Sequence, residues 1–335
     1  WTAQSQPALK PEENLPPPWS FAPTVWVSAG RWDAYARTVR DALLKATRGQ
    51  KAAEKEATVL ARGKKPKELV TAIRDHVAKR IRSAGPGLDD LPLTAVSAAD
   101  RTYAEGYGNS ADQAVLLYAM LAKAGLKPEF VLASQWSVVK ALAPPLAQYA
   151  RRPLLPTVLV RVEVDGKPVY LNDTDQYAAL GATGFDGCLG LSLGTGKIET
   201  ISAPAERREQ REVSYDVEVA ANGNARITKT ARYRGDAFGQ KHKEFAEMPP
   251  EERHRYYQEA VARLSQSARA EGDLKTDFTT YPGVETFTAI VEDFALREGE
   301  YLYFELPESL SNVLGLRADE RSNDLYWSDP TRSSL

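Results

Sequence analysis

A short stretch near residue 110 brings together residue types that acyl-transfer chemistry uses. A tight Gly108-Asn109 turn leads into Ser110, and an apolar helix then runs to a stop at Gly125. The start of a helix favours a nucleophile, because the helix dipole and the free N–H groups lower the pKa of a thiol there. Position 110 is therefore a candidate nucleophile site.

The same serine also has a purely structural interpretation. Ser110 and Gln113 have the spacing of a capping box, in which the hydroxyl accepts a backbone N–H and Gln113 reaches back. Such a cap stabilises a helix by about 1 kcal/mol and involves no catalysis. The residues around Ser110 leave both interpretations open.

A second group of polar residues follows a predicted β-hairpin. Residues 157–172 alternate around Asp165-Gly166, a strong hairpin signal, and the second strand leads into the sequence NDTD at 172–175. Asp and Thr commonly form a hydrogen-bonded turn at such a place. Alternatively, Asp173 or Asp175 could lie near Ser110 and act as a general base without histidine.

Together these segments resemble the active-site regions of bacterial transglutaminase-like proteins. That family has Gly-Asp-Cys-x-Asp at a helix start, where this chain has GNSAD at 108–112. It also has a histidine that opens the hairpin and an aspartate in Leu-Asp-Pro-Thr-Asp at the hairpin's end, where this chain has LNDTD at 171–175. The cysteine, histidine and aspartate positions thus align with Ser110, Thr157 and Asn172.

Replacement of all three residues removes the chemistry that the resemblance implies. A serine without a base is un-ionised at neutral pH, Thr157 cannot take its proton, and Asn172 has no imidazolium to stabilise. We therefore predict an inactive transglutaminase-like pseudoenzyme that binds or scaffolds a protein, peptide or glycan. The side chains expected to line its cleft beside the three replaced positions are Asn109, Asp112, Asp173 and Asp175.

Two other functions remain open. One is a serine-dependent amidase, peptidase or acyltransferase that uses Ser110 with a non-histidine base. The other is a purely structural spacer between further domains. The family resemblance also implies an exported protein of the periplasm or cell surface, and it implies no cofactor.

The resemblance covers most of the chain and implies an α+β fold. We expect a papain/transglutaminase-like core, with N-terminal helices and a central helix on an antiparallel sheet, followed by a β-rich domain with an inserted helix. The expected division is an extended proline-rich segment at 1–27, which is the tail of a preceding β domain, a core at 28–203, and a truncated β-rich domain at 204–335. Residues 83–107 are expected to form a loop.

Alternation and turn residues predict the elements of the β-rich domain. A second hairpin surrounds Asn222-Gly223, and a helical segment over 237–270 is broken at Pro249-Pro250. Further strands are expected at 274–278, 285–291 and 301–306, and around Tyr326-Trp327. The helical segment carries a solvated acidic face of Glu244, Glu247, Glu251 and Glu252.

Composition excludes several classes of function. The formal net charge of −2 gives no reason to expect nucleic acid as a partner, and no apolar run reaches the length of a membrane span. Cys188 is the one cysteine, so no intrachain disulfide can form. The three histidines lie far apart in sequence, which predicts no metal site, and His76 is expected to be a partly buried structural residue.

Overall fold

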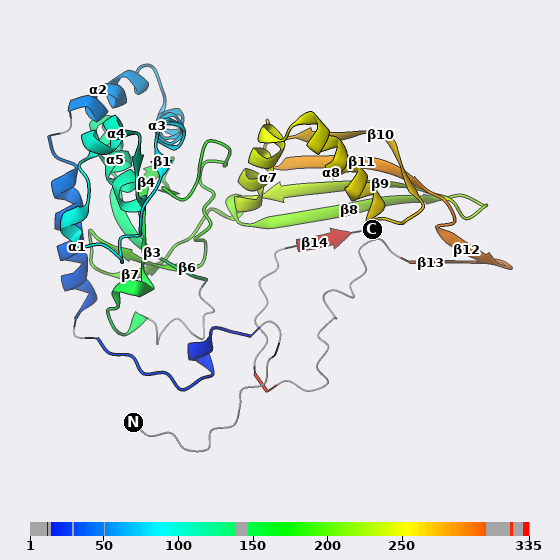
Figure 1. The fold of residues 1–335 in the computed structure, drawn as a ribbon, viewed down its shortest axis with the longest axis horizontal. Helices are drawn as coiled ribbons and strands as arrows, with labels where there is room; N and C mark the ends of the chain where they lie inside the picture. The colour runs from blue at the N-terminus through cyan, green and yellow to red at the C-terminus, as the bar shows by residue number, and fades with distance from the viewer. Residues whose placement is uncertain are drawn as a thin grey trace.

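The computed structural model describes residues 12, 15–28, 30–49, 51–137, 147–305, 322–323 and 331–334. For residues 135–137 and 331–334 it describes the backbone alone. Much of the proline-rich segment and the expected strand at Tyr326-Trp327 lie outside these residues. Two five-stranded sheets, each covered by helices, dominate the described part (Figure 1). The predicted α+β fold, with a helix-covered core followed by a β-rich region, is confirmed.

In the described part of the chain, five helices precede the first strand of the first sheet. Their bounds are α1 (Trp32–Ala46), α2 (Lys51–Leu60), α3 (Pro66–Arg80), α4 (Ala99–Glu105) and α5 (Ser110–Lys123). Short 3-10 turns are η1 (Pro18–Ser20), η2 (Leu93–Ala95), η3 (Arg152–Leu154) and η4 (Ala205–Arg207). The segment expected as a loop at 83–107 therefore contains α4, which ends at Gly106 in a left-handed conformation.

Helix α5 is the centre of the first core. Its surface is apolar nearly all round, which is typical of a helix enclosed by other elements, and it contacts α1 to α4 as well as β3 and β4. The helix ends as predicted at Gly125, whose φ of 87° allows a Schellman motif. In that motif Leu126 N–H donates to Leu121 O and Gly125 N–H donates to Ala122 O, both at 3.1 Å.

The first sheet is antiparallel with strand order β5-β4-β3-β6-β7. The strands are β3 (Glu129–Ser137), β4 (Thr157–Val164), β5 (Lys167–Leu171), β6 (Cys188–Ser192) and β7 (Ile198–Thr200). The predicted β4–β5 hairpin turns at Asp165 and Gly166, both with positive φ, as a type I′ turn requires. A separate two-stranded pair joins β1 (Arg82–Ser83) to β2 (Tyr107–Gly108), directly before α5.

The second sheet has strand order β10-β11-β9-β8-β14. Its strands are β8 (Gln210–Val219), β9 (Ala225–Arg234), β10 (Ala268–Asp277), β11 (Gly283–Val291) and β14 (Thr331–Ser334), and the last of these pairs in parallel with β8. Helices α7 (Gly235–Glu247) and α8 (Pro250–Ala262) lie together along this sheet (Figure 1). A hairpin of β12 (Ala295–Glu298) and β13 (Tyr301–Phe304) projects from its far end.

The predicted break at Pro249-Pro250 separates α7 from α8, as the missing proline N–H groups require. The expected helix to residue 270 is too long, because α8 ends at Ala262 and β10 begins at Ala268. Within the described part of the chain, no helix is long and apolar enough to cross a membrane.

Candidate functional site at the start of helix α5

The cap of α5 differs from the capping box expected at Ser110 and Gln113. Asn109 is the N-cap residue, and its Oδ1 accepts the N–H of Ala111 at 2.9 Å and of Asp112 at 3.0 Å. Ser110 is already the first helical residue, so its hydroxyl does not occupy the capping position. Gln113 instead donates to Ile81 O at 3.4 Å.

Asp112 completes the cap and fixes the preceding loop. Its Oδ2 accepts the N–H of Asn109 at 3.2 Å, and its Oδ1 accepts the N–H of Ser97 at 2.7 Å. Asn109 and Asp112 are only 8% and 6% exposed. Gly108 leaves room for this packing, because a Cβ there would lie 2.9 Å from the Asp112 Cβ. The oxygens of these two expected cleft residues are thus engaged at the start of the helix.

Asn172 joins the start of α5 to the sheet. Its Nδ2 donates to Ser110 O and to Val158 O, both at 2.7 Å. Val158 follows Thr157 in β4, so the structure brings the three predicted triad positions together from α5, β4 and the end of β5. The φ of Asn172 is 87°, a left-handed conformation that Asn tolerates better than most residues.

The two carboxylates that could replace a histidine base are hydrogen-bonded elsewhere. Asp173 Oδ2 accepts the Thr183 hydroxyl and the Gly184 N–H, the latter at 3.1 Å. Burial raises the pKa of Asp173 to about 6. Asp175 accepts the Tyr177 N–H at 3.0 Å and lies 3.6 Å from Lys243 Nζ of α7. Both residues therefore stabilise the turn that follows β5.

Among the residues that the structure describes, no carboxylate or imidazole is hydrogen-bonded to the Ser110 hydroxyl. The Nδ1 of His242 lies 2.9 Å from Tyr177 O, and the Nε2 of His254 lies 2.9 Å from Gln258 Nε2. His76 stacks on Tyr103 with ring centroids 6.0 Å apart, and burial lowers its pKa. The expectation of a partly buried His76 is confirmed.

A thiol and a metal centre are two further kinds of reactive group. Cys188 is buried, and burial raises the pKa of its thiol to about 11, so the thiol is protonated at neutral pH. The described part of the chain contains no group of three His, Cys, Asp or Glu residues placed to hold a metal ion.

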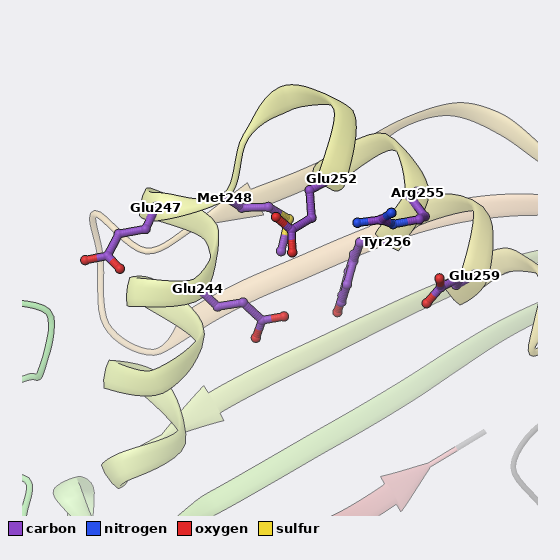
Figure 2. A pocket seen from close by; sticks show the side chains of 7 residues that line it. All are labelled: Glu244, Glu247, Met248, Glu252, Arg255, Tyr256 and Glu259. Atoms are coloured by element: carbon purple, nitrogen blue, oxygen red, sulfur yellow. The ribbon is translucent and has the colours of Figure 1, made fainter.

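Sequence reasoning did not single out two of the cavities that lie on the second sheet and its helices. One lies in the angle between α7 and α8, and Figure 2 shows Glu244 and Glu252 pointing into it beside Tyr256. Part of the expected acidic face thus lines a hollow. The other cavity lies between α8 and the sheet and is lined by Arg211, Lys229 and Glu285 among others. Strand alternation could have indicated this cavity. Every second residue of a strand faces the same side, and Arg211 and Lys229 fall on the side of the buried residues of β8 and β9.

Comparisons with known proteins identify no family for the chain. No protein-family model and no curated protein matches it. Among solved structures, a crystal structure from Parabacteroides distasonis described as a "putative protease" is similar at 15% identity, with a TM-score of 0.46. The alignment covers 94% of this chain and 62% of that one, so this chain spans less than two thirds of that protein's length. A likeness of this size carries no argument about activity.

Proposed function

We propose that this chain is a catalytically inactive transglutaminase-like protein that binds or scaffolds a protein, peptide or glycan in the periplasm or at the cell surface. The observation that carries the proposal is the pair of hydrogen bonds from Asn172 to Ser110 O and Val158 O. Because both acceptors are carbonyl oxygens, the pair of bonds needs a group with two donor hydrogens, such as the amide NH2 of Asn172. An ionised aspartate at this position could make neither.

The position that would orient a catalytic imidazole is therefore used to hold α5 against β4. Catalysis by Ser110 would also need backbone donors directed at a developing oxyanion. The N–H groups of Ala111 and Asp112 both donate to Asn109 Oδ1. The first turn of α5 thus uses two of its free donors for its own cap, which supports a structural role for these positions.

A serine-dependent hydrolase or acyltransferase is the competing function. Its best support is Asp173, whose pKa of about 6 suits a general base at neutral pH. The hydrogen bonds of that carboxylate to Thr183 and Gly184 direct it into its own turn. Asp175 is similarly engaged by Tyr177 N–H and Lys243.

Labelling with a broad serine-reactive fluorophosphonate tests the absence of catalysis. Intact-mass measurement of the wild type and of Ser110→Ala, beside a known serine hydrolase, is expected to show no adduct that depends on Ser110. A single adduct on the wild type that disappears in Ser110→Ala would refute the inactive assignment and support the serine-dependent enzyme.

A Ser110→Cys variant gives a second test because the native Cys188 is buried. Its alkylation rate by iodoacetamide as a function of pH reports the pKa of the new thiol. Without an imidazole, we expect an inflection about one unit or less below the ordinary cysteine value of about 8.5, from the helix start alone. An inflection below about 6 would indicate an activating group that contradicts the proposal.

The binding part of the proposal needs a ligand test of its own. Peptide and glycan arrays are probed with the wild type and with Ser110→Gln, which places a longer side chain at the start of α5. A ligand that the wild type binds and the variant loses is expected. Equal binding by both proteins, or no ligand on either array, would contradict a ligand site at this position.

A further inference from the structure

The second sheet contains a small polar cavity that is independent of the start of α5. Its volume is about 170 Å³, and it lies between the inner face of strands β8, β9 and β11 and helix α8. The charged and tyrosine side chains that line it are Arg211, Lys229, Arg263, Tyr233, Tyr256 and Glu285. Most of its lining is polar, although it adjoins the core of the sheet.

The negative charge in this cavity is held in place by tyrosines. Glu285 is 6% exposed, and its two oxygens accept the hydroxyls of Tyr233 at 2.7 Å and of Tyr256 at 2.9 Å. Burial and the neighbouring Glu285 raise the pKa of both tyrosines, which therefore stay protonated donors. These bonds connect β9 and β11 to α8 and form one wall of the cavity.

Three cations form the rest of the charged lining. Arg211 on β8 and Lys229 on β9 extend from the same face of the sheet as Glu285. Arg263 caps the end of α8 and is solvent-exposed, with Glu259 at 4.0 Å. With Glu259 counted beside Arg263, three positive charges and two carboxylates leave a formal excess of one positive charge around a small, partly enclosed volume. Such a concave cationic surface attracts anions.

Arg211 is the member of this set with unused hydrogen-bonding capacity. Its Nε is buried and has no hydrogen-bond partner among the residues that the structure describes. A buried guanidinium N–H without an acceptor costs free energy, and an anionic oxygen would relieve that cost. The planar guanidinium offers paired N–H groups that match the two oxygens of a carboxylate or phosphate.

We propose that this cavity binds an oxyanion, namely the carboxylate or phosphate group of a small molecule, with Arg211 as the principal contact and Lys229 and Arg263 beside it. The volume equals that of about six water molecules, which suits one acid group with a few carbon atoms. The inference does not depend on the proposed function, because it uses side chains of the second sheet and α8 alone.

The cavity on the other side of Tyr256 gives an internal contrast. That cavity is lined by Glu244, Glu252 and Glu259 and would repel an oxyanion (Figure 2). Arg255 belongs to this acidic lining and lies on the same helix as Tyr256. Arg255→Gln therefore removes one positive charge, as Arg211→Gln or Arg263→Gln does, but it removes that charge from the acidic cavity.

Isothermal titration of the full chain with inorganic phosphate and, separately, with succinate tests the proposal. Saturable binding of at least one of them at low ionic strength is expected, weakened at high salt. Arg211→Gln is expected to weaken it about tenfold or more, Arg263→Gln a few-fold, and Arg255→Gln not measurably. Binding of only phosphate or only succinate identifies which oxyanion the cavity takes.

Two results would overturn the inference. One is that neither phosphate nor succinate binds the wild type, and the other is that Arg211→Gln and Arg263→Gln both bind as the wild type does. Circular dichroism melts check that each variant is folded. If Arg211→Gln does not fold, Arg263→Gln with its matched control Arg255→Gln still decides, since both positions are exposed.

Discussion

Replacement of Asn172 is the most direct perturbation of the contact between α5 and β4. Asn172→Ala removes the donor to both Ser110 O and Val158 O. It also places alanine at a φ of 87°, where a Cβ approaches the following carbonyl. Asn172→Gly removes the same two hydrogen bonds but tolerates the left-handed conformation. The pair of variants separates the hydrogen bonds from the backbone strain.

The magnitudes follow from these two contributions. Each hydrogen bond contributes about 1 kcal/mol net, so their loss costs about 2 kcal/mol in either variant. The left-handed conformation adds about 1 kcal/mol for alanine. We therefore expect Asn172→Ala to lower the free energy of unfolding by about 3 kcal/mol and Asn172→Gly by about 2 kcal/mol.

Asn172→Asp adds a pH dependence with a defined sign. A carboxylate here would face two carbonyl oxygens, so folding should raise its pKa above the unfolded value of about 3.9. The protonated form, which can donate one bond, is then favoured in the folded protein. Stability is retained below the unfolded pKa and lost as the pH rises through the folded pKa. This variant should be less stable than Asn172→Ala at neutral pH.

Urea denaturation, followed by hydrogen exchange in the peptide that covers residues 107–123, measures these effects at the start of α5. The local readout matters because the second sheet has its own core. An Asn172→Ala variant within about 0.5 kcal/mol of the wild type would refute the structural role of this amide. So would an Asn172→Asp variant whose stability does not fall between low and neutral pH.

Two further predictions concern Asp173, in the turn after β5, and Gly235, the first residue of α7. Folding raises the pKa of Asp173 from 3.8 to about 6, so the folded protein favours the protonated carboxyl. The stability that this gives is fully present below pH 3.8 and is lost as the pH rises through about 6. Asp173→Asn should remove up to about 3 kcal/mol of that dependence, seen as a flatter plot of urea midpoint against pH, whereas an unchanged slope would contradict the assignment. Gly235 has a φ of 62°, and a Cβ there would lie 2.5 Å from backbone atoms of Glu209. Gly235→Ala should therefore lower the melting temperature far more than Gly272→Ala, which shares the positive φ but meets open space; equal melting temperatures would count against this packing.

The sequence predicts elements well where periodicity and turn residues agree. Helix α5 has both an apolar pattern and a glycine stop, and the β4–β5 and β8–β9 hairpins have alternation around Asp-Gly and Asn-Gly. The sequence does not predict helix α4, because its seven residues follow a segment rich in proline and glycine and only Ala99 and Thr102 of them are buried. The end of α8 differs from the predicted one because no glycine or proline marks it. The first residue of β10, Ala268, pairs with Val291 at the far end of the β10–β11 hairpin.

The site was only partly predictable. The resemblance pointed to Ser110, Thr157 and Asn172, but no local pattern shows that one amide bonds two carbonyls from different elements. The predicted cap at Ser110 lies one residue after the observed cap at Asn109, because serine and asparagine are both good N-cap residues. Arg211 and Lys229 of the proposed oxyanion cavity lie on the inner face of the sheet, as strand alternation predicts. Charged side chains usually prefer the solvent-facing side, so composition alone does not indicate this placement.

The turn after β5 connects the start of α5 to the second sheet. Asn172 bonds α5, while Asp175 lies beside Lys243 and Tyr177 O lies 2.9 Å from His242 Nδ1, both on α7. Substitutions at the two ends of this turn should therefore be energetically coupled, because residues in one hydrogen-bond network do not contribute to stability independently. A double-mutant cycle of Asn172→Gly and His242→Ala, measured by urea denaturation, is expected to give a coupling energy above about 0.5 kcal/mol. Strict additivity of the two substitutions would mean that the start of α5 and helix α7 respond independently.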